Sequence, residues 1–449
     1  MTQSHPEILT EIEAGLQAIP LIDVHTHIDA AHLSARGLHD ILLYHMVISD
    51  LYSAGCPSGA RLSEDPDNAE VESRIIEALP YLKHIQNTSI FWGVRTTLRD
   101  LYGWEEPLTT ANWRRLDARI RERAGDPSWP LTILKRAEIH RQVTELWRGR
   151  DGSANDLFQY SLEWAFFARA QWGQNDIPLF ELEKAWNEQI PSPPLPVTLS
   201  QRPSLAQTIR SVEDVQDALQ HYCEHIPYNQ IISTTQHIST DIQYRSITDE
   251  EMANAINNRP HAGEVERDIY ASYLLEHFLT ELEKHADQIV FQFSLGAEPL
   301  PYESGSKLNQ ETVYHIAEII AHHPRLRFQV LLSSAHANQA LCTLARELPN
   351  LSLAGYWWHN FFPTIIRQVM SERLDMLPTN KQIGFFSDAY CVDWAYVKAV
   401  MVRKQLAEVL ATRVVEGQHK LDEAMAVARG ILYESPQTLL GLKPSPALM

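Results

Sequence analysis

Cysteine is scarce in this sequence: the chain of 449 residues contains four, and they are widely spaced. There is no CxxC pair and no regular cysteine spacing, which excludes a disulfide framework and a cysteine-rich zinc module as the basis of the fold. We therefore expect free thiols, as in a protein of a reducing compartment. The four positions are Cys56, Cys223, Cys342 and Cys391.

Long apolar runs and positive charge are also in short supply. No uninterrupted apolar run reaches the roughly 18 residues that a membrane span needs, and residues 1–13 are polar and acidic, unlike a signal peptide. With 57 acidic and 38 basic residues the formal net charge is −19, which argues against binding of nucleic acid or of an anionic membrane. A glycine-rich phosphate loop and a nucleophile elbow are absent as well. We expect a cytoplasmic protein whose partner is a small molecule.

The chain does contain a series of short apolar runs of strand length, separated by helical stretches. Their cores are continuously apolar, which is typical of parallel strands buried on both faces. Alternation of such strands with helices predicts an α/β protein with a (β/α)8 TIM barrel. The runs are 19–24, 230–235, 288–295, 327–333, 351–356 and 382–387, with 142–146 as a weaker candidate.

A length of 449 residues is compatible with one barrel that carries insertions, and we predict a single domain over 1–449. The interval from about 60 to 215 differs from the rest, because helical patterns dominate it. Helices are expected at 70–84 and 110–124, and the aromatic-rich segment 155–172 also looks helical. We interpret 60–215 as a mostly helical insertion near the mouth of the barrel.

The most informative motif is the pair His25 and His27, which directly follows the first apolar run. Two histidines separated by one residue at the end of a strand point to the same side, as two ligands of one divalent metal must. Asp388 follows the last predicted strand, so the three side chains form a candidate site with mixed nitrogen and oxygen ligands. The alternative is that the histidines only bond to backbone and that Asp388 caps a helix or turn.

Catalytic groups of α/β barrels lie at the C-terminal ends of the strands, so the other strand ends supply further candidates. His237, Ser294, Glu298 and His336 are polar candidates of this kind, although histidines there often only bond to backbone. An aromatic cluster follows the run at 351–356 and suits the wall of a sugar pocket. Its members are Trp357, Trp358, His359 and Asn360.

These features resemble the uronate isomerases (glucuronate isomerases) of the amidohydrolase superfamily. The His-x-His motif alone is common to the superfamily, whereas the combination of segments is more specific. The similar segments are residues 22–27, 38–41, 98–104 followed by 109–113, 356–360, 384–388 and 431–440.

The resemblance implies a (β/α)8 barrel that interconverts D-glucuronate or D-galacturonate with the corresponding keto acid. It implies His25, His27 and Asp388 as ligands of one divalent metal, with zinc the expected ion. Asp388, His237 and Tyr390 are the catalytic residues that we predict, and a homo-oligomer is compatible with the family. The predicted substrate-binding residues are Trp357, Trp358, His359, Asn360 and Arg367.

The chain departs from the family pattern at several positions. Ser294 stands where the third metal histidine is expected, and Tyr390 stands where a substrate arginine is expected. Segments 44–53 and 236–238 also lack the family's residues. His237 or His336 is a candidate replacement for the nitrogen ligand, and the candidate carboxylate binders are Arg95, Arg99, Arg367 and Arg403.

Two other functions stay open at this point. The same barrel with a metal can generate hydroxide, so a metal-dependent hydrolase or lyase is one alternative. The other is a barrel that has lost metal and catalysis and acts only in binding.

Overall fold

The computed structural model of the chain describes most of its residues. The described ranges are 4–57, 71–148, 157–164, 175–188, 204–238, 243–295, 310–333, 335–356 and 362–443.

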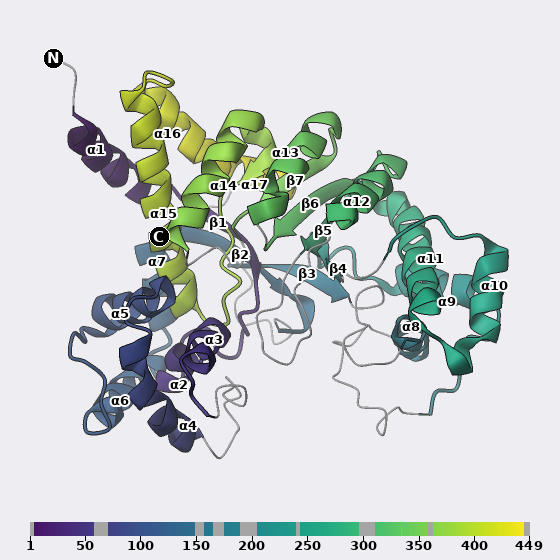
Figure 1. Cartoon of the computed structure of the whole chain (residues 1–449), viewed down its shortest axis with the longest axis horizontal. Coiled ribbons are helices and arrows are strands. Elements are labelled where there is room, and N and C mark those ends of the chain that lie inside the picture. The colour runs from purple at the N-terminus through teal and green to yellow at the C-terminus, as the bar shows by residue number, and fades with distance from the viewer. Residues whose placement is uncertain are drawn as a thin grey trace.

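Eight parallel strands form one sheet in which every strand pairs with the next one along the chain (Figure 1). This order and direction are those of a (β/α)8 fold, as the apolar runs predicted. The strands are β1 (Leu21–Thr26), β2 (Ile139–Glu145), β3 (Phe158–Trp164), β4 (Ser233–Ile238), β5 (Val290–Leu295), β6 (Arg327–Leu332), β7 (Leu351–Ala354) and β8 (Gln382–Ile383).

The sheet curls so that the segment after β8 returns to β1. The backbone N–H of Asp388 donates to the carbonyl of His25 at 3.0 Å, and the N–H of His27 donates to the carbonyl of Ala389 at 2.9 Å. The side chain of Asp23 strengthens the junction by accepting a 2.7 Å bond from the N–H of Ser387. These contacts bring the ends of the first and last strands together.

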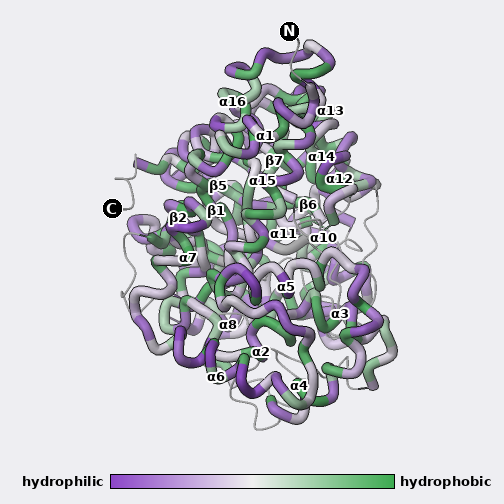
Figure 2. Tube along the Cα trace, turned by 90° about the vertical axis from the view of Figure 1, so that its left-hand side faces the viewer, coloured by the Kyte–Doolittle hydropathy of each residue, from purple (hydrophilic) through white to green (hydrophobic). Residues whose placement is uncertain are grey.

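Helices cover the outside of the sheet and form two further groups at its ends (Figure 1). Helices α2–α6 lie together on one side, and α8–α11 gather on the other. In Figure 2 hydrophilic residues are prominent along α6, whose only buried residues are Trp113, Leu116 and Ile120. The helices of the first half are α1 (His5–Gln17), α2 (Leu38–Leu42), α3 (His45–Ser53), α4 (Val71–Ala78), α5 (Ser89–Tyr102), α6 (Trp113–Ala124), α7 (Trp129–Ala137), α8 (Ile177–Asn187) and α9 (Val212–His225).

The second half of the chain supplies α10 (Asp249–Asn257), α11 (Glu264–Leu282), α12 (Gln310–His322), α13 (Asn338–Glu347), α14 (Pro363–Met376), α15 (Val392–Val415), α16 (Leu421–Arg429) and α17 (Ser435–Leu439). Short 3-10 helices include η2 (Leu79–His84), η3 (Leu146–Arg148) and η7 (Ala335–Ala337). Helix α15 is buried along most of its length, because it packs against α1, α7 and α14. None of the helices in the described ranges has the length and apolar character needed to cross a bilayer.

Two expectations from the sequence can be compared directly with these elements. The helix expected over 155–172 is wrong in its first half, because residues 158–164 form β3. The interval 60–215 accordingly contains the barrel strands β2 and β3 as well as helices. The expectation of free thiols is confirmed, since none of the four cysteines, all of them buried, forms a disulfide.

Gly355, just after β7, occupies a position at which a side chain does not fit. Its φ is +50°, and a Cβ atom there would lie 2.0 Å from the ring of the buried Phe386. Gly355→Ala should therefore lower the free energy of unfolding by about 3 kcal/mol or more, from backbone strain together with overpacking. The matched control is Gly417→Ala, where φ is +74° but no atom lies within 4 Å, so a loss of about 1 kcal/mol is expected. The free energy of unfolding of both variants is measured by denaturant titration. Equal losses in the two variants would contradict the close packing of Gly355 against Phe386.

Candidate metal and active site

His25 and His27 stand at the C-terminal end of β1, where the strand is fully buried. His25 is 3% exposed and lies within β1, whereas His27 directly follows the strand. Their rings meet edge to face with centroids 4.9 Å apart. The spacing of two residues therefore does place both imidazoles beside one another, as the motif predicted.

Asp388 reaches the same point from the β8 side of the sheet. Its φ of +53° is in the left-handed region, which is uncommon for residues other than glycine and is often found at functional sites. Two contacts hold this conformation: the bond from its N–H to His25, and a 2.9 Å bond from the hydroxyl of Tyr44 to its carbonyl oxygen. The carboxylate consequently turns toward the histidines, with Oδ1 3.5 Å from His25 Nε2 and 3.2 Å from His27 Nε2.

The three side chains have the donor set of a divalent metal site. One ligand atom from each of His25, His27 and Asp388 lies within 4.8 Å of the other two. Metal–ligand bonds of about 2.1 Å in tetrahedral geometry separate neighbouring ligand atoms by about 3.4 Å, so the distances to Asp388 fit. Within the described ranges, it is the one group of three or more potential metal ligands that lie this close together.

Glu145 lies behind His27 and supports this interpretation. It ends β2, its side chain is 3% exposed, and its Oε1 bonds to His27 Nδ1. A carboxylate on one ring nitrogen fixes the orientation of the imidazole and leaves the other nitrogen for a metal. In this structure that other nitrogen, Nε2, is the atom that faces Asp388.

The electrostatics of the cluster favour a cation. Burial would lower the pKa of His27, but the charge of Glu145 and the hydrogen bonds with Asp388 and Glu145 outweigh it and hold the pKa well above its usual value. Burial would raise the pKa of Asp388, but the hydrogen bond and charge of His27, with Lys398 and His25, keep it below the ordinary range. Two carboxylates thus flank His27, an arrangement that attracts positive charge.

A second layer of polar residues lies beneath the cluster. The amine of the fully buried Lys398 on α15 is 2.6 Å from the hydroxyl of Tyr44, which in turn bonds to Asp388. Burial raises the pKa of Asp23 to about 7, although hydrogen bonds with Ser387 and Gln142 and the charge of Lys398 act to lower it. These groups hold the β1 and β8 ends in place.

Tyr390 is, besides Asp388, a second predicted catalytic residue that the structure brings to the cluster. Its ring stacks on that of His27, with centroids 5.1 Å apart and planes 28° from parallel. With 38% of its surface exposed, Tyr390 forms part of the accessible side of the site. The guanidinium of Arg148, at the end of η3, lies 5.6 Å from the centroid of the same ring.

The remaining strand-end candidates differ in what the structure describes of them. His237 lies in β4 in register with Ser294 of β5, but its side chain is outside the described part of the molecule. Ser294 itself is buried, and its Oγ has no hydrogen-bond partner among the described atoms. Trp357, Trp358, His359, Asn360 and Glu298 lie outside the described residues. The alternative ligand His336 is exposed, in η7.

The arginine candidates lie away from the cluster. Arg367 is on the outer helix α14, where its guanidinium bonds to Gln405 of α15, so a place beside the substrate is not supported. Arg403 donates to the carbonyls of Ile19 and Ala137, which precede β1 and β2, and therefore lies at the opposite end of the strands.

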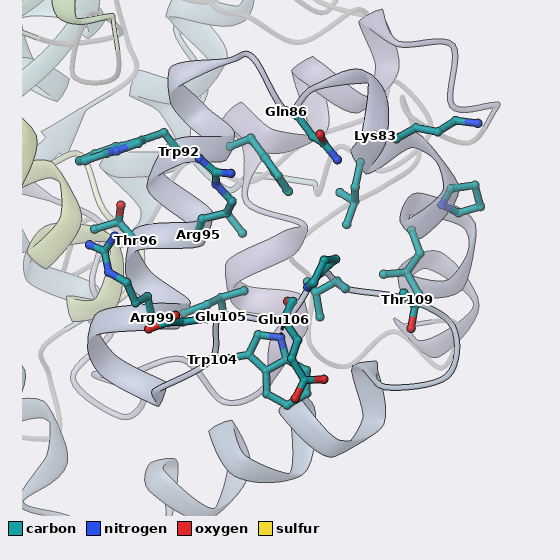
Figure 3. Close-up of a pocket in the computed structure, with 18 of the residues that line it drawn as sticks. Lys83, Gln86, Trp92, Arg95, Thr96, Arg99, Trp104, Glu105, Glu106 and Thr109 are labelled. Atoms are coloured by element: carbon teal, nitrogen blue, oxygen red, sulfur yellow. Dashed lines mark hydrogen bonds between the residues drawn. The ribbon is translucent and has the colours of Figure 1, made fainter.

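Arg95 and Arg99 line a separate cavity of about 780 Å3 in the helical layer (Figure 3). It is formed by η2, α5 and residues 104–110, and none of its lining residues belongs to the cluster. Glu105 and Glu106 line the cavity together with the two arginines, so the cavity has no single sign of charge.

Glu145 and Arg148 were missed in the strand-end analysis of the sequence. Glu145 ends β2 and Arg148 ends η3 directly after it, and this strand had the weakest apolar pattern. A search of the end of the weak run at 142–146 would have found both.

The fold and site together define a curled (β/α)8 sheet with a candidate metal centre where the segment after its last strand meets its first strand. Comparison with solved structures identifies proteins that share this fold. The chain superimposes on glucuronate isomerase from Caulobacter crescentus with a TM-score of 0.77 and 16% identity, covering 99% of this chain and 96% of that one. For uronate isomerase from Thermotoga maritima the values are 0.74 and 12%, with 98% and 100% covered.

A third similar structure is uronate isomerase from Bacillus halodurans, with a TM-score of 0.67, 17% identity and 99% of each chain covered. No protein-family model matches the sequence, and no curated protein matches it either. The chain thus has the fold of the uronate isomerases over nearly its whole length, at a sequence identity that establishes the fold alone.

Proposed function

We propose that this protein is a metal-dependent aldose–ketose isomerase that acts on D-glucuronate, D-galacturonate or a related sugar acid. The observation that carries the proposal is that His25, His27 and Asp388 meet at one point within the fold of the uronate isomerases. The histidines come from the first strand of the sheet and the aspartate from the segment after the last strand. The carboxylate of Glu145 behind His27 supports a metal-ligating role.

The reaction needs a group that moves a proton between C2 and C1 and a group that stabilises negative charge on the sugar oxygens. His25, His27 and Asp388 are the residues that would hold the metal. When bound, a divalent metal would supply a Lewis acid for the carbonyl oxygen. Asp388 is the carboxylate placed at the cluster itself and is our candidate for the proton transfer. Tyr390, stacked on His27, orients that ring and borders the space for substrate.

Nuclear magnetic resonance in D2O tests the proposal. Protein saturated with a divalent metal is incubated with D-glucuronate and then with D-galacturonate, and the proton on C2 is followed. We expect its signal to disappear as keto acid forms, because C2 becomes a carbonyl carbon. D-Glucose, which lacks the carboxylate, is the comparison substrate and should react far more slowly. A persistent C2 signal with both sugar acids would contradict the proposal and direct the search to hydrolysis and lyase reactions.

A further inference from the structure

We propose that the cavity of the helical layer binds an organic anion with an apolar ring system, at a site separate from the metal cluster. The proposal does not depend on the isomerase reaction, because none of the residues that line the cavity belongs to the cluster. The volume of about 780 Å3 lies within the range of about 300–1,000 Å3 that is usual for small-molecule sites.

Local hydrogen bonds hold one wall of the cavity in place. Helix α5 ends at Gly103, whose φ of +60° is the left-handed conformation common at the ends of helices. Trp104 then donates its backbone N–H to the carbonyl of Leu98 at 3.0 Å and its indole N–H to the carbonyl of Glu106 at 2.8 Å. The segment 104–110 is thereby fixed beside α5, so this wall is a defined part of the fold (Figure 3).

The inner surface of the cavity is largely apolar. Five of its lining residues are buried and belong to one apolar core cluster of the chain: Leu79, Leu82, Phe91, Leu98 and Trp104. A ligand with rings or a hydrocarbon chain would remove apolar surface from water at this position, which favours binding.

The acidic side chains at the cavity already interact with cations. Both carboxylate oxygens of Glu106 bond to Nη2 of Arg115, at 2.7 and 2.6 Å. Glu105 lies close enough to Arg99 for their charges to interact, and Nε of Arg99 also donates to Asp100 at 2.7 Å. Charges of both signs therefore line the cavity, but its carboxylates are compensated.

Two cations at the cavity have no such partner. Lys83 of η2 and Arg95 of α5 line it and are exposed, and neither forms an ion pair or hydrogen bond with the residues that the structure describes. In Figure 3 they come from different elements, and the amide of Gln86 lies on the same side as Lys83. A guanidinium and an ammonium at one apolar cavity are suitable donors for a carboxylate, sulfonate or phosphate.

The charge of the surrounding layer also favours an anion. Residues 79–136 contain ten Lys and Arg against six Asp and Glu, whereas the whole chain has a net charge of −19. This layer is a net positive region of an acidic protein, so its potential attracts anions. The apolar surface and the cations together favour an anion with an apolar body over a neutral molecule, and over a sugar acid, which has no such body.

Two fluorescent probes test the proposal. 8-Anilinonaphthalene-1-sulfonate carries three aromatic rings and a sulfonate, and N-phenyl-1-naphthylamine has the same rings without the sulfonate. Fluorescence titration of the whole chain measures the stoichiometry and the Kd of each probe. We expect one saturable site for the sulfonate per chain. Its Kd should rise about 3- to 10-fold in Arg95→Gln and in Lys83→Gln, while the Kd of the neutral probe stays within about twofold, because the lost charge interacts with the sulfonate alone.

Two control variants separate this site from other causes. Arg114→Gln removes an exposed cation of the same layer that pairs with Glu72 at 2.9 Å and does not line the cavity. Replacing His25 and His27 by alanine alters the metal cluster and leaves the cavity intact. Both controls should bind the sulfonate probe with an unchanged Kd, and circular dichroism confirms that every variant is folded.

Several results would overturn the proposal. They are the absence of saturable binding of the sulfonate probe, an equal Kd in Arg95→Gln and Arg114→Gln, an equal loss of both probes in Arg95→Gln, and loss of the sulfonate probe in the His25/His27 variant. Neither probe is a sugar acid, so each of these results leaves the proposed isomerase reaction untouched, and failure of that reaction leaves the binding site untouched.

Discussion

Replacing His25 and His27 together by alanine should remove the bound divalent metal and lower turnover of the sugar acid by about 1,000-fold or more. Lewis-acid stabilisation by a metal is worth several kcal/mol, and each 1.4 kcal/mol corresponds to a factor of ten. Both rings lie at the end of a strand rather than in the apolar core, so the double variant should still fold. Metal content per chain by mass spectrometry, with circular dichroism for folding, measures the outcome.

A second pair of histidines provides the control. His315 and His322 are on the outer helix α12 and do not belong to the cluster. Replacing both by alanine removes the same number of imidazoles as the His25/His27 variant does. Metal content and turnover of that variant should equal those of the unaltered protein. An unchanged metal stoichiometry in the His25/His27 variant would refute the ligand assignment.

Asp388→Asn is expected to lower turnover by about 100- to 10,000-fold, the range that a positioned acid or base contributes. Asparagine tolerates the left-handed backbone at φ +53° nearly as well as aspartate, so the variant tests the carboxylate and not the fold. Because Asp388 is assigned to the proton transfer, the Kd of L-gulonate, an unreactive sugar acid with a primary alcohol in place of the aldehyde of D-glucuronate, should change little. Turnover is measured at saturating metal, with metal content determined in parallel.

Asp388→Ala distinguishes chemistry from backbone strain. Alanine is less tolerant of the left-handed region, so this variant should lose conformational stability as well as activity, by about 1 kcal/mol or more. Near-normal turnover of Asp388→Asn at full metal occupancy would rule out a role for Asp388 in moving the proton.

Much of the metal site could be predicted from the sequence because its members follow strand ends. Asp388 lies more than 360 positions after His25 and His27, yet parallel strands in a curled sheet bring the ends of β1 and β8 together. The apolar runs predicted seven of the eight strands for the same physical reason, since strands buried on both faces are continuously apolar.

The missing strand, β3, had a different pattern. Residues 158–164 alternate aromatic or aliphatic side chains with Gln159, Ser161 and Glu163, which is the period of two of a strand. The richness in aromatic residues hid that alternation and suggested a helix. In this segment the period of two, and not the aromatic content, indicates the secondary structure.

The rest of the site depends on tertiary contacts that carry no local signature. Lys398 lies on α15 and reaches Tyr44 across 354 positions, and neither residue belongs to a motif. Glu145 meets His27 because of the pairing register between β1 and β2, which the sequence alone does not specify. In the same way Arg367 and Arg403 were candidates by residue type, but the packing of their helices directs them elsewhere.

The most direct test of the account is a titration of metal into metal-free protein while C2 proton loss from D-glucuronate is followed in D2O. The account predicts no reaction without metal and a rate that rises in proportion to occupancy up to one divalent ion per chain. It also predicts that the His25/His27 double variant shows no such rise. Full-rate loss of the C2 proton in the metal-free protein, or a rise that the double variant shares, would contradict a catalytic metal held by these residues.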